Sequence, residues 1–228
     1  MKKSLFVIAA ALVGAGCIYA QDAESNWPVN LGFKVGIPVT DMFSASNTTQ
    51  FNSNQNVPGS AFTSAVPRYE FGVSGEFHLP KHMRFEVDGI FKRGGFDSAM
   101  PYGTNGALAY RPTTFNWWEV PGLFKVNVLG GHLRPFVDFG ATLRHISTMD
   151  QTTYAAGLVG GYSMTDNSVA IHNRNSYGGV AGFGITFKKG PFELTPEARY
   201  TRWANEAFEA NGLRTNLDQG DVLLGITF

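Results

Sequence analysis

Apolar residues alternate with polar or small residues in eight separate segments of the chain. In each segment every second residue is apolar, and the residues between are mostly glycine, hydroxyl-bearing or charged. A period of two is typical of β-strands that bury one face. The pattern therefore predicts eight strands, at residues 31–37, 69–79, 84–92, 118–128, 136–144, 177–188, 192–200 and 221–228.

The connections between these segments alternate strictly between short and long. The short ones are Pro80–His82, Leu129–His132 and Lys189–Pro191, and the long ones are Thr40–Pro67, Gly94–Thr114, His145–Asn175 and Ala204–Gln219. Membrane barrels of bacteria have short periplasmic turns and long external loops, and closure leaves no unpaired strand edge in lipid. We expect an all-β fold, an eight-stranded antiparallel up-and-down transmembrane β-barrel.

In such a barrel the apolar faces point to lipid and the polar faces line the lumen. Charges of both signs are mixed on the polar faces, so they can pair in a central network. The predicted lumen charges are Lys34, Glu70, Glu76, Arg84, Glu86, Asp88, Lys92, Glu119, Lys125, Asp138, Arg144, Lys188, Glu193, Glu197, Arg199 and Asp221. Aromatic residues at the strand ends suit two interfacial girdles. They are Tyr69, Phe91, Trp118 and Tyr177 at one rim, and Phe77, Phe85, Phe187, Phe192 and Phe228 at the other.

The first twenty residues have the features of a secretory signal peptide. Two lysines precede the apolar run Leu5–Val13, and small residues lead to a cut after Ala20. We expect residues 1–20 to be the signal peptide, 21–30 a short periplasmic segment and 31–228 the barrel. Cys17 loosely resembles a lipidation site, but Gly14 stands where such sites carry leucine, so an ordinary signal residue is the preferred interpretation.

Charge and cysteine content exclude several classes of protein. Loss of Lys2 and Lys3 would lower the basic residues from 18 to 16, against 18 acidic ones, so there is no basic surface typical of nucleic-acid binding. The chain has one cysteine, in the signal segment, so no disulfide framework is available. No later segment reaches the roughly 18 apolar residues of a membrane helix. A membrane role must be built from strands, and we expect a monomer.

Four short motifs resemble the bacterial outer-membrane β-barrel domain family. They are Trp118–Lys125 (WEVPGLFK), Pro135–Gly140 (PFVDFG), Glu197–Tyr200 (EARY) and the terminal Gly225–Phe228 (GITF). The resemblance implies a location in outer-membrane lipid. It also implies that the barrel assembly machinery transiently reads a C-terminal signal made of Val222, Leu224, Ile226 and Phe228. The loops resemble no known family.

Catalytic and metal-binding chemistry has little support. The pair His145 and Ser147 resembles the His-x-Ser of outer-membrane lipid A deacylases, because alternation would put both on one face and a base beside a hydroxyl suits acyl transfer. No acidic partner can be placed, so we expect rim residues and no catalytic site. The histidines are scattered, and we predict no metal and no cofactor. They are His78, His82, His132, His145 and His172.

A filled, non-enzymatic barrel is the function class that the sequence favours. Side chains about fill the lumen of an eight-stranded barrel. The long loops are rich in Asn, Thr, Ser and Gly, and the first has aromatic residues and one charge, Asp41, so they suit a structural or surface-interaction role with an external ligand. Inward glycines leave a narrow passive channel as the alternative, and a lipid A-modifying hydrolase is the distant one. These glycines are Gly32, Gly36, Gly72, Gly140, Gly182 and Gly184.

Overall fold

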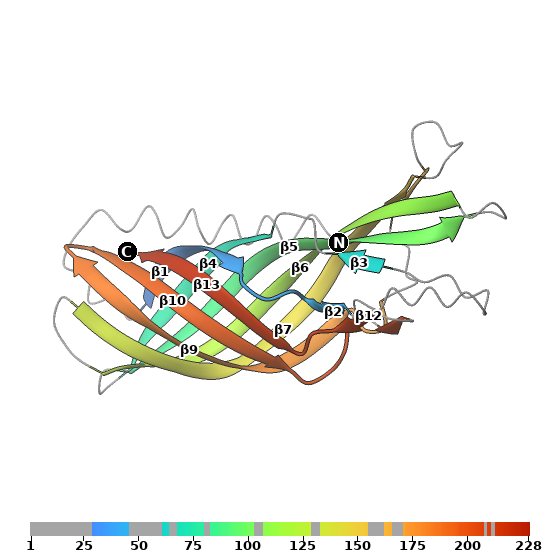
Figure 1. The fold of residues 1–228 in the computed structure, drawn as a ribbon. Helices are drawn as coiled ribbons and strands as arrows, with labels where there is room; N and C mark the ends of the chain where they lie inside the picture. Colours follow the sequence, from blue (N-terminus) through green and yellow to red (C-terminus); the bar gives the residue numbers. More distant parts are fainter. Residues whose placement is uncertain are drawn as a thin grey trace, which may run out of the picture.

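Eight antiparallel strands form a closed barrel in the computed structural model (Figure 1). Each strand pairs with the next along the chain, and the last pairs with the first, with Gly32 opposite Thr227. The eight-stranded up-and-down topology predicted from the alternation is thus confirmed. The barrel strands are β1 (Val29–Pro38), β4 (Tyr69–Leu79), β5 (Met83–Tyr102), β6 (Ala107–Asn127), β7 (Leu133–Thr153), β9 (Asn175–Lys189), β10 (Phe192–Trp203) and β13 (Asp218–Thr227).

The structure describes residues 29–45, 61–63, 68–79, 83–102, 107–128, 133–154, 162–165, 171–207, 209–210 and 213–228. The predicted signal peptide, Cys17, and the turns containing His82 and His132 lie outside these ranges. Within them, no helix is long and apolar enough to cross a membrane.

The two faces of the wall differ as the alternation predicts. Large apolar side chains on the outer face are about half exposed, for example Phe33 at 45% and Val73 at 41%, whereas their neighbours Lys34 and Ser74 are buried at 3% and 5%. Aromatic rings on adjacent strands touch across this outer surface, such as Phe91 and Trp118 with ring centroids 5.3 Å apart. An exposed apolar belt over a charged interior fits a barrel surrounded by lipid.

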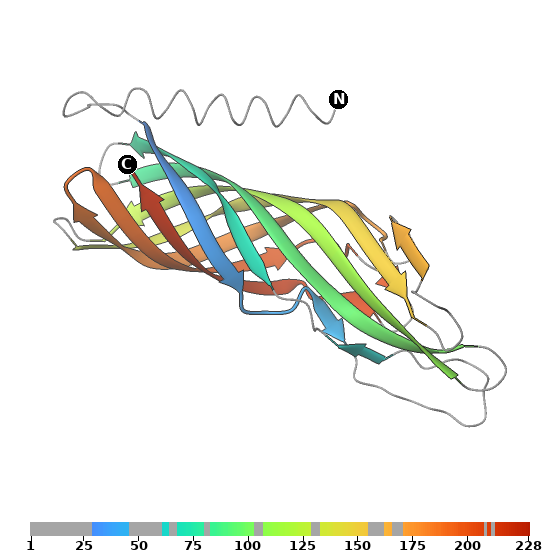
Figure 2. The ribbon, with the colours of Figure 1, turned by 90° about the horizontal axis from the view of Figure 1, so that it is seen from above.

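The strand ends that the tight connections join lie at one end of the barrel, and those that the long connections join lie at the other (Figure 2). The turn from β9 to β10 contains Gly190, whose φ of 61° lies in the left-handed region that glycine adopts without strain. This segregation of short and long connections matches the predicted periplasmic and external ends.

Three neighbouring strands, β5, β6 and β7, are the longest of the barrel, and the other five have 10 to 15 residues. These three strands have 20, 21 and 21 residues, whereas β1 and β13 have 10 each. A strand needs only about 9–11 residues to cross the hydrocarbon. The residues of β5, β6 and β7 beyond this number lengthen the sheet by roughly 30 Å, at ~3.3 Å per residue, at the end that has the long connections. Residues 94–102, 107–114 and 145–153, which were expected to belong to the loops 94–114 and 145–175, are strands instead, because strand pairing continues where no lipid requires an apolar face.

Short strands pair with the edges of this extended sheet or form a separate sheet near it. The strand β3 (Ala61–Thr63) pairs with β5, and β8 (Tyr162–Thr165) pairs with β7, so both edges of the extended sheet are covered. A separate small sheet joins β2 (Phe43–Ala45), β12 (Leu213–Thr215) and β11 (Glu209–Ala210). The pairing of β2 with β12 therefore joins the first long connection to the last one.

The register predicts a large cost for a charge on the outer face. We expect Val73→Arg to lower the free energy of unfolding by roughly 2–4 kcal/mol, because Val73 lies near the middle of β4 and faces lipid. The matched change Val73→Leu should cost less than about 1 kcal/mol. Urea unfolding of the protein refolded in lipid vesicles measures both, and equal costs would refute the assigned register.

Candidate functional site

The barrel interior holds almost every charge that the alternation assigned to it. All of the predicted lumen residues except Lys188 are at most 5% exposed. The Lys188 side chain is 50% exposed and lies 3.8 Å from Glu193. Lys188 lies opposite Glu193, one pair before the last pair of β9, close to the turn where the wall ends.

Glu86 is the centre of the larger group of ion pairs, which we call the inner network. One carboxylate oxygen pairs with Lys34 and, at 2.6 Å, with Arg199, and the other lies 2.6 Å from Lys125. Three cations from three strands thus meet on one carboxylate. The inner network consists of Lys34, Arg84, Lys125, Arg199, Glu76, Glu86, Asp88, Glu193 and Glu197.

The other members of the inner network lie on β4, β5 and β10. Arg84 lies 2.6 Å from Glu76 and 2.9 Å from Glu193, and Arg199 lies 2.6 Å from Asp88 and also pairs with Glu197. The pairs Arg84–Glu193 and Arg199–Asp88 join side chains that are more than 100 residues apart in sequence. Any arrangement that separates one of these pairs leaves a buried charge uncompensated. The ion pairs therefore favour a single arrangement of the interior.

Lys92 organises a second group, the outer hub, nearer the loops. Its ammonium lies 3.0 Å from Glu70, 2.9 Å from Glu119 and 2.7 Å from Asp221. Glu119 also accepts a hydrogen bond of 2.8 Å from the Trp117 indole. The outer hub is therefore connected to the Trp117 side chain, which lies on β6 closer to the loops.

Two buried charges lie outside both groups. Asp138 is 2% exposed and Arg144 is 1% exposed, and neither has a hydrogen-bond partner for its charged group among the described residues. The Arg144 guanidinium instead stacks over the Trp203 ring, 3.9 Å from its centroid. Both residues were predicted as members of one charge network, but the structure does not connect them to it by an ion pair within the ranges described.

An apolar layer closes the loop end of the lumen. We call it the lid cluster, and the inward faces of β6 and β7 supply most of it. Ile171 packs against it. Its buried members are Met42, Phe115, Trp117, Ile146, Met149 and Ala207.

Three of the long connections hold the lid cluster in place. The backbone N–H of Asn216 donates to the Met42 carbonyl at 2.8 Å, and that of His172 donates to the Ala207 carbonyl at 2.8 Å. The Ala207 N–H donates to the Thr215 hydroxyl at 3.0 Å. Segments from the first, third and fourth long connections thus converge over the lumen, although nothing in their local sequence predicts it.

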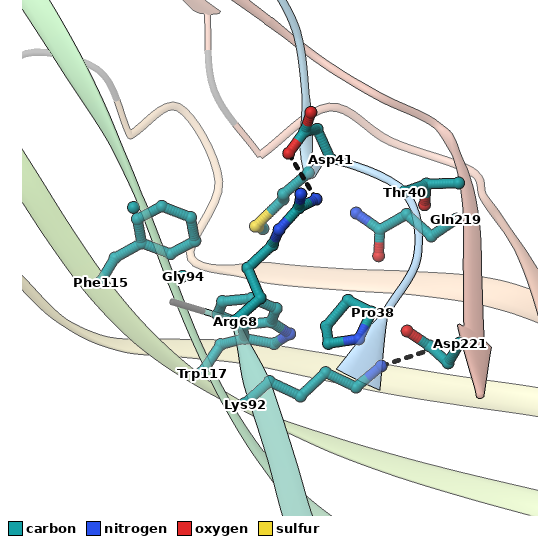
Figure 3. Close-up of a pocket in the computed structure, with 12 residues that line it drawn as sticks. Pro38, Thr40, Asp41, Arg68, Lys92, Gly94, Phe115, Trp117, Gln219 and Asp221 are labelled. Carbon is teal, nitrogen blue, oxygen red and sulfur yellow. Dashed lines mark hydrogen bonds and ion pairs between the residues drawn. The ribbon is translucent and has the colours of Figure 1, made fainter. Parts of the chain in front are cut away.

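A small cavity lies between the lid cluster and the outer hub (Figure 3). An ion pair of 2.5 Å between Arg68 and Asp41 spans its mouth, and Lys92 with Asp221 forms its floor. Gln219 projects into the cavity from β13. Its amide oxygen accepts from the Trp203 indole at 2.9 Å, which connects this cavity to the Arg144 side of the lumen.

The candidate pair His145 and Ser147 is not arranged for acyl transfer. A β-bulge in β7 leaves Ser147 unpaired between Ile146 and Thr148, so strict alternation fails here. The Ser147 hydroxyl donates to the Asn116 carbonyl at 3.0 Å, and the His145 ring lies 2.7 Å from the Asn175 side-chain oxygen on the exposed surface. The bulge interrupts the alternation on which the expectation of a shared face rested.

The fold and the faces of its wall define an integral β-barrel of the outer-membrane class. The chain belongs to the outer membrane protein beta-barrel domain family, whose model matches residues 19–202. The family resemblance and the outer-membrane location predicted from the sequence are thereby confirmed.

Solved structures of small outer-membrane barrels are similar over most of the chain. Neisserial surface protein A is 12% identical, with 90% of this chain and 98% of that chain covered and a TM-score of 0.44. The attachment invasion locus protein of Yersinia pestis is 10% identical, covering 88% and 98%, with a TM-score of 0.36. The N-terminal barrel domain of Pseudomonas aeruginosa OprF is 11% identical, covering 88% and 98%, with a TM-score of 0.35. No curated protein matches the chain significantly.

Proposed function

We propose that this protein is a non-conducting, non-enzymatic barrel that holds an extended sheet and its loops outside the outer membrane, where they contact an external ligand or surface. The observation that carries the proposal is the filled lumen. Inward side chains from the inner network to the lid cluster are at most 6% exposed. In a water-filled passage these side chains would be in contact with solvent.

The extended sheet supports the surface role. β5, β6 and β7 run far past the length that lipid requires, and β3 and β8 cover the edges, so the projecting part has few unpaired backbone groups. A rigid sheet holds loops at a fixed height and lowers the conformational entropy lost when they bind. A barrel with only a structural role does not need this extension.

Cell binding tests the surface role. In the trimmed variant, residues 98–111 at the tip of β5 and β6 are replaced by a two-residue Asn-Gly turn, at a register where Ser98 faces Arg111. We expect cells with the wild-type barrel to bind immobilised polysaccharide or extracellular-matrix protein at least several-fold better than cells with the trimmed barrel, at equal surface amounts. Equal binding by both, or wild-type binding no greater than that of cells without the barrel, would refute the surface role.

We also propose that Phe228 completes the signal by which the barrel is assembled. Its backbone exchanges hydrogen bonds with Leu31, with N–H to carbonyl distances of 2.9 and 3.3 Å, and its ring centroid lies 6.2 Å from that of Phe33. The residue thus lies where β13 closes on β1. We expect deletion of Phe228 to reduce the compact, heat-modifiable band in outer-membrane fractions about tenfold or more. Trimming the β5–β6 tip is the control that should leave the band intact, and wild-type amounts of the band without Phe228 would contradict the assignment.

A further inference from the structure

We propose that the lumen has a binding site for one small monovalent anion, a halide, at the guanidinium of Arg144. Arg144 lies on β7 directly below the lid cluster member Ile146, and it is 1% exposed. All three of its guanidinium nitrogens lack a hydrogen-bond acceptor among the residues that the structure describes. A buried charge of this kind is costly unless an acceptor or a counter-ion satisfies it.

The stacking of Arg144 orients its donors. The guanidinium carbon of Arg144 lies over the Trp203 ring, 3.9 Å from its centroid, and a cation in this position leaves its N–H groups available to a further ligand. Gly178 lies opposite both Thr142 and Trp203 in the strand register, and a Cβ there would be 3.1 Å from the indole ring. The missing side chain at Gly178 lets Trp203 lie flat beneath the arginine.

No carboxylate forms an ion pair or hydrogen bond with Arg144 in the described part of the chain. Glu119 faces Arg144 across β6 and β7, but its two oxygens are bound by the Trp117 indole at 2.8 Å and by Lys92 at 2.9 Å. Asp138 lies on the same strand, six residues away, which is roughly 20 Å along an extended chain. The acidic excess of the outer hub is concentrated around Lys92 and contacts that ammonium instead.

Three polar groups that can donate hydrogen bonds lie around Arg144 without a partner among the described residues. Ser176 faces Arg144 on β9, and Thr142 lies two residues along β7 on the same inward face. Both hydroxyls are buried and unpartnered within the described part of the chain. The amide nitrogen of Gln219, beside Trp203, is unpartnered there as well.

This set of donors selects the chemistry of the ligand. An arginine with adjacent hydroxyl and amide donors suits a ligand that accepts hydrogen bonds from all of them and carries the opposite charge, which is an anion. The lid cluster above is tightly packed and apolar, so a single-atom anion fits better than a sulfate or a phosphate. Chloride is the halide that bacterial surroundings supply in quantity, and bromide is its experimental substitute.

Halide titration and anomalous scattering test the site in the full-length barrel. Chloride replaces gluconate at constant ionic strength, and we expect the midpoint of thermal unfolding to rise by several degrees. Arg144→Met should abolish this response. Arg202→Met is the matched control and should retain it, because Arg202 is an exposed arginine paired with Asp218. Crystals grown in bromide should show an anomalous peak within hydrogen-bond distance of the Arg144 guanidinium.

A second variant keeps the test valid if Arg144→Met does not fold. Ser176→Ala removes one donor and should raise the chloride concentration at half-effect about tenfold, the factor expected for one charge-assisted hydrogen bond. Ordered water alone at Arg144, with no bromide peak, would overturn the proposal. An unfolding midpoint that responds equally to chloride in wild type and in both variants would overturn it as well.

Discussion

Gly140→Ala is expected to prevent the barrel from folding. Gly140 lies on β7 opposite Leu123, and a Cβ built on it would lie 1.9 Å from the Gly122 carbonyl oxygen and 3.0 Å from the Leu123 Cα. Both of these atoms belong to the backbone of β6, so no side-chain rotation relieves the clash. Forced overpacking typically costs 1–3 kcal/mol even where side chains can move, so we expect a cost of at least about 3 kcal/mol here.

The matched control for this change is Gly179→Ala on the adjacent strand. A Cβ at Gly179 meets no atom within 4 Å, so this variant should fold as well as wild type. The heat-modifiable band after refolding measures both, and we expect it to be lost for Gly140→Ala alone. Normal folding of Gly140→Ala would show that the wall is not packed as closely as the structure places it.

The second large effect is expected at Glu86. Glu86→Gln removes the charge that faces Lys34, Lys125 and Arg199, and breaking a buried ion pair by removing one partner costs about 3–5 kcal/mol. The control is Asp138→Asn, which removes a carboxylate of equal burial that has no ion pair among the described residues. The lumen also has nine buried carboxylates against six buried lysines and arginines, so the loss of one unpaired acid should change stability by less than about 1 kcal/mol.

Urea unfolding of the refolded barrel distinguishes these two variants. We expect the unfolding midpoint of Glu86→Gln to fall clearly below that of wild type, while Asp138→Asn stays close to it. If both variants lost the same stability, the cost would follow burial alone, and the inner network would have no special role.

The membrane-spanning part of the fold could be predicted from the sequence because lipid constrains it strongly. Each outward position in the hydrocarbon must be apolar, so alternation alone separates Lys34 and Glu86 from Phe33 and Val87. The same physics explains where the prediction stopped. Residues 94–102 and 107–114 continue as paired strands beyond the length that lipid requires, where neither face has to be apolar, so the period-two signal in the sequence is lost.

The lid cluster could be predicted only in part. Phe115 and Trp117 continue the inward face of β6 beyond Glu119, so the alternation that found Glu119 also points to them. Met42 and Ala207 come from connections that are distant in sequence, and their burial depends on contacts among loops. The bulge at Ser147 is likewise set by strand pairing, and no residue type in the segment indicates it.

The partners of the lumen charges could not be predicted. Alternation places a side chain inside the barrel but does not say which neighbour it meets, because long side chains reach across the lumen. Arg144 faces Glu119 in register yet stacks on Trp203, and Lys125 faces Asp138 yet pairs with Glu76 and Glu86. These choices follow from the packing of all eight strands together.

Single-channel recording in planar lipid bilayers tests the closed lumen most directly. Refolded full-length protein is inserted from vesicles in which the heat-modifiable band confirms folding, and a wide-pore porin serves as the positive control. We predict that insertions of this protein leave the bilayer current at its baseline, because the inner network and the lid cluster fill the lumen. Stable, reproducible open states accompanying insertion of the folded protein would contradict the closed barrel and establish a channel.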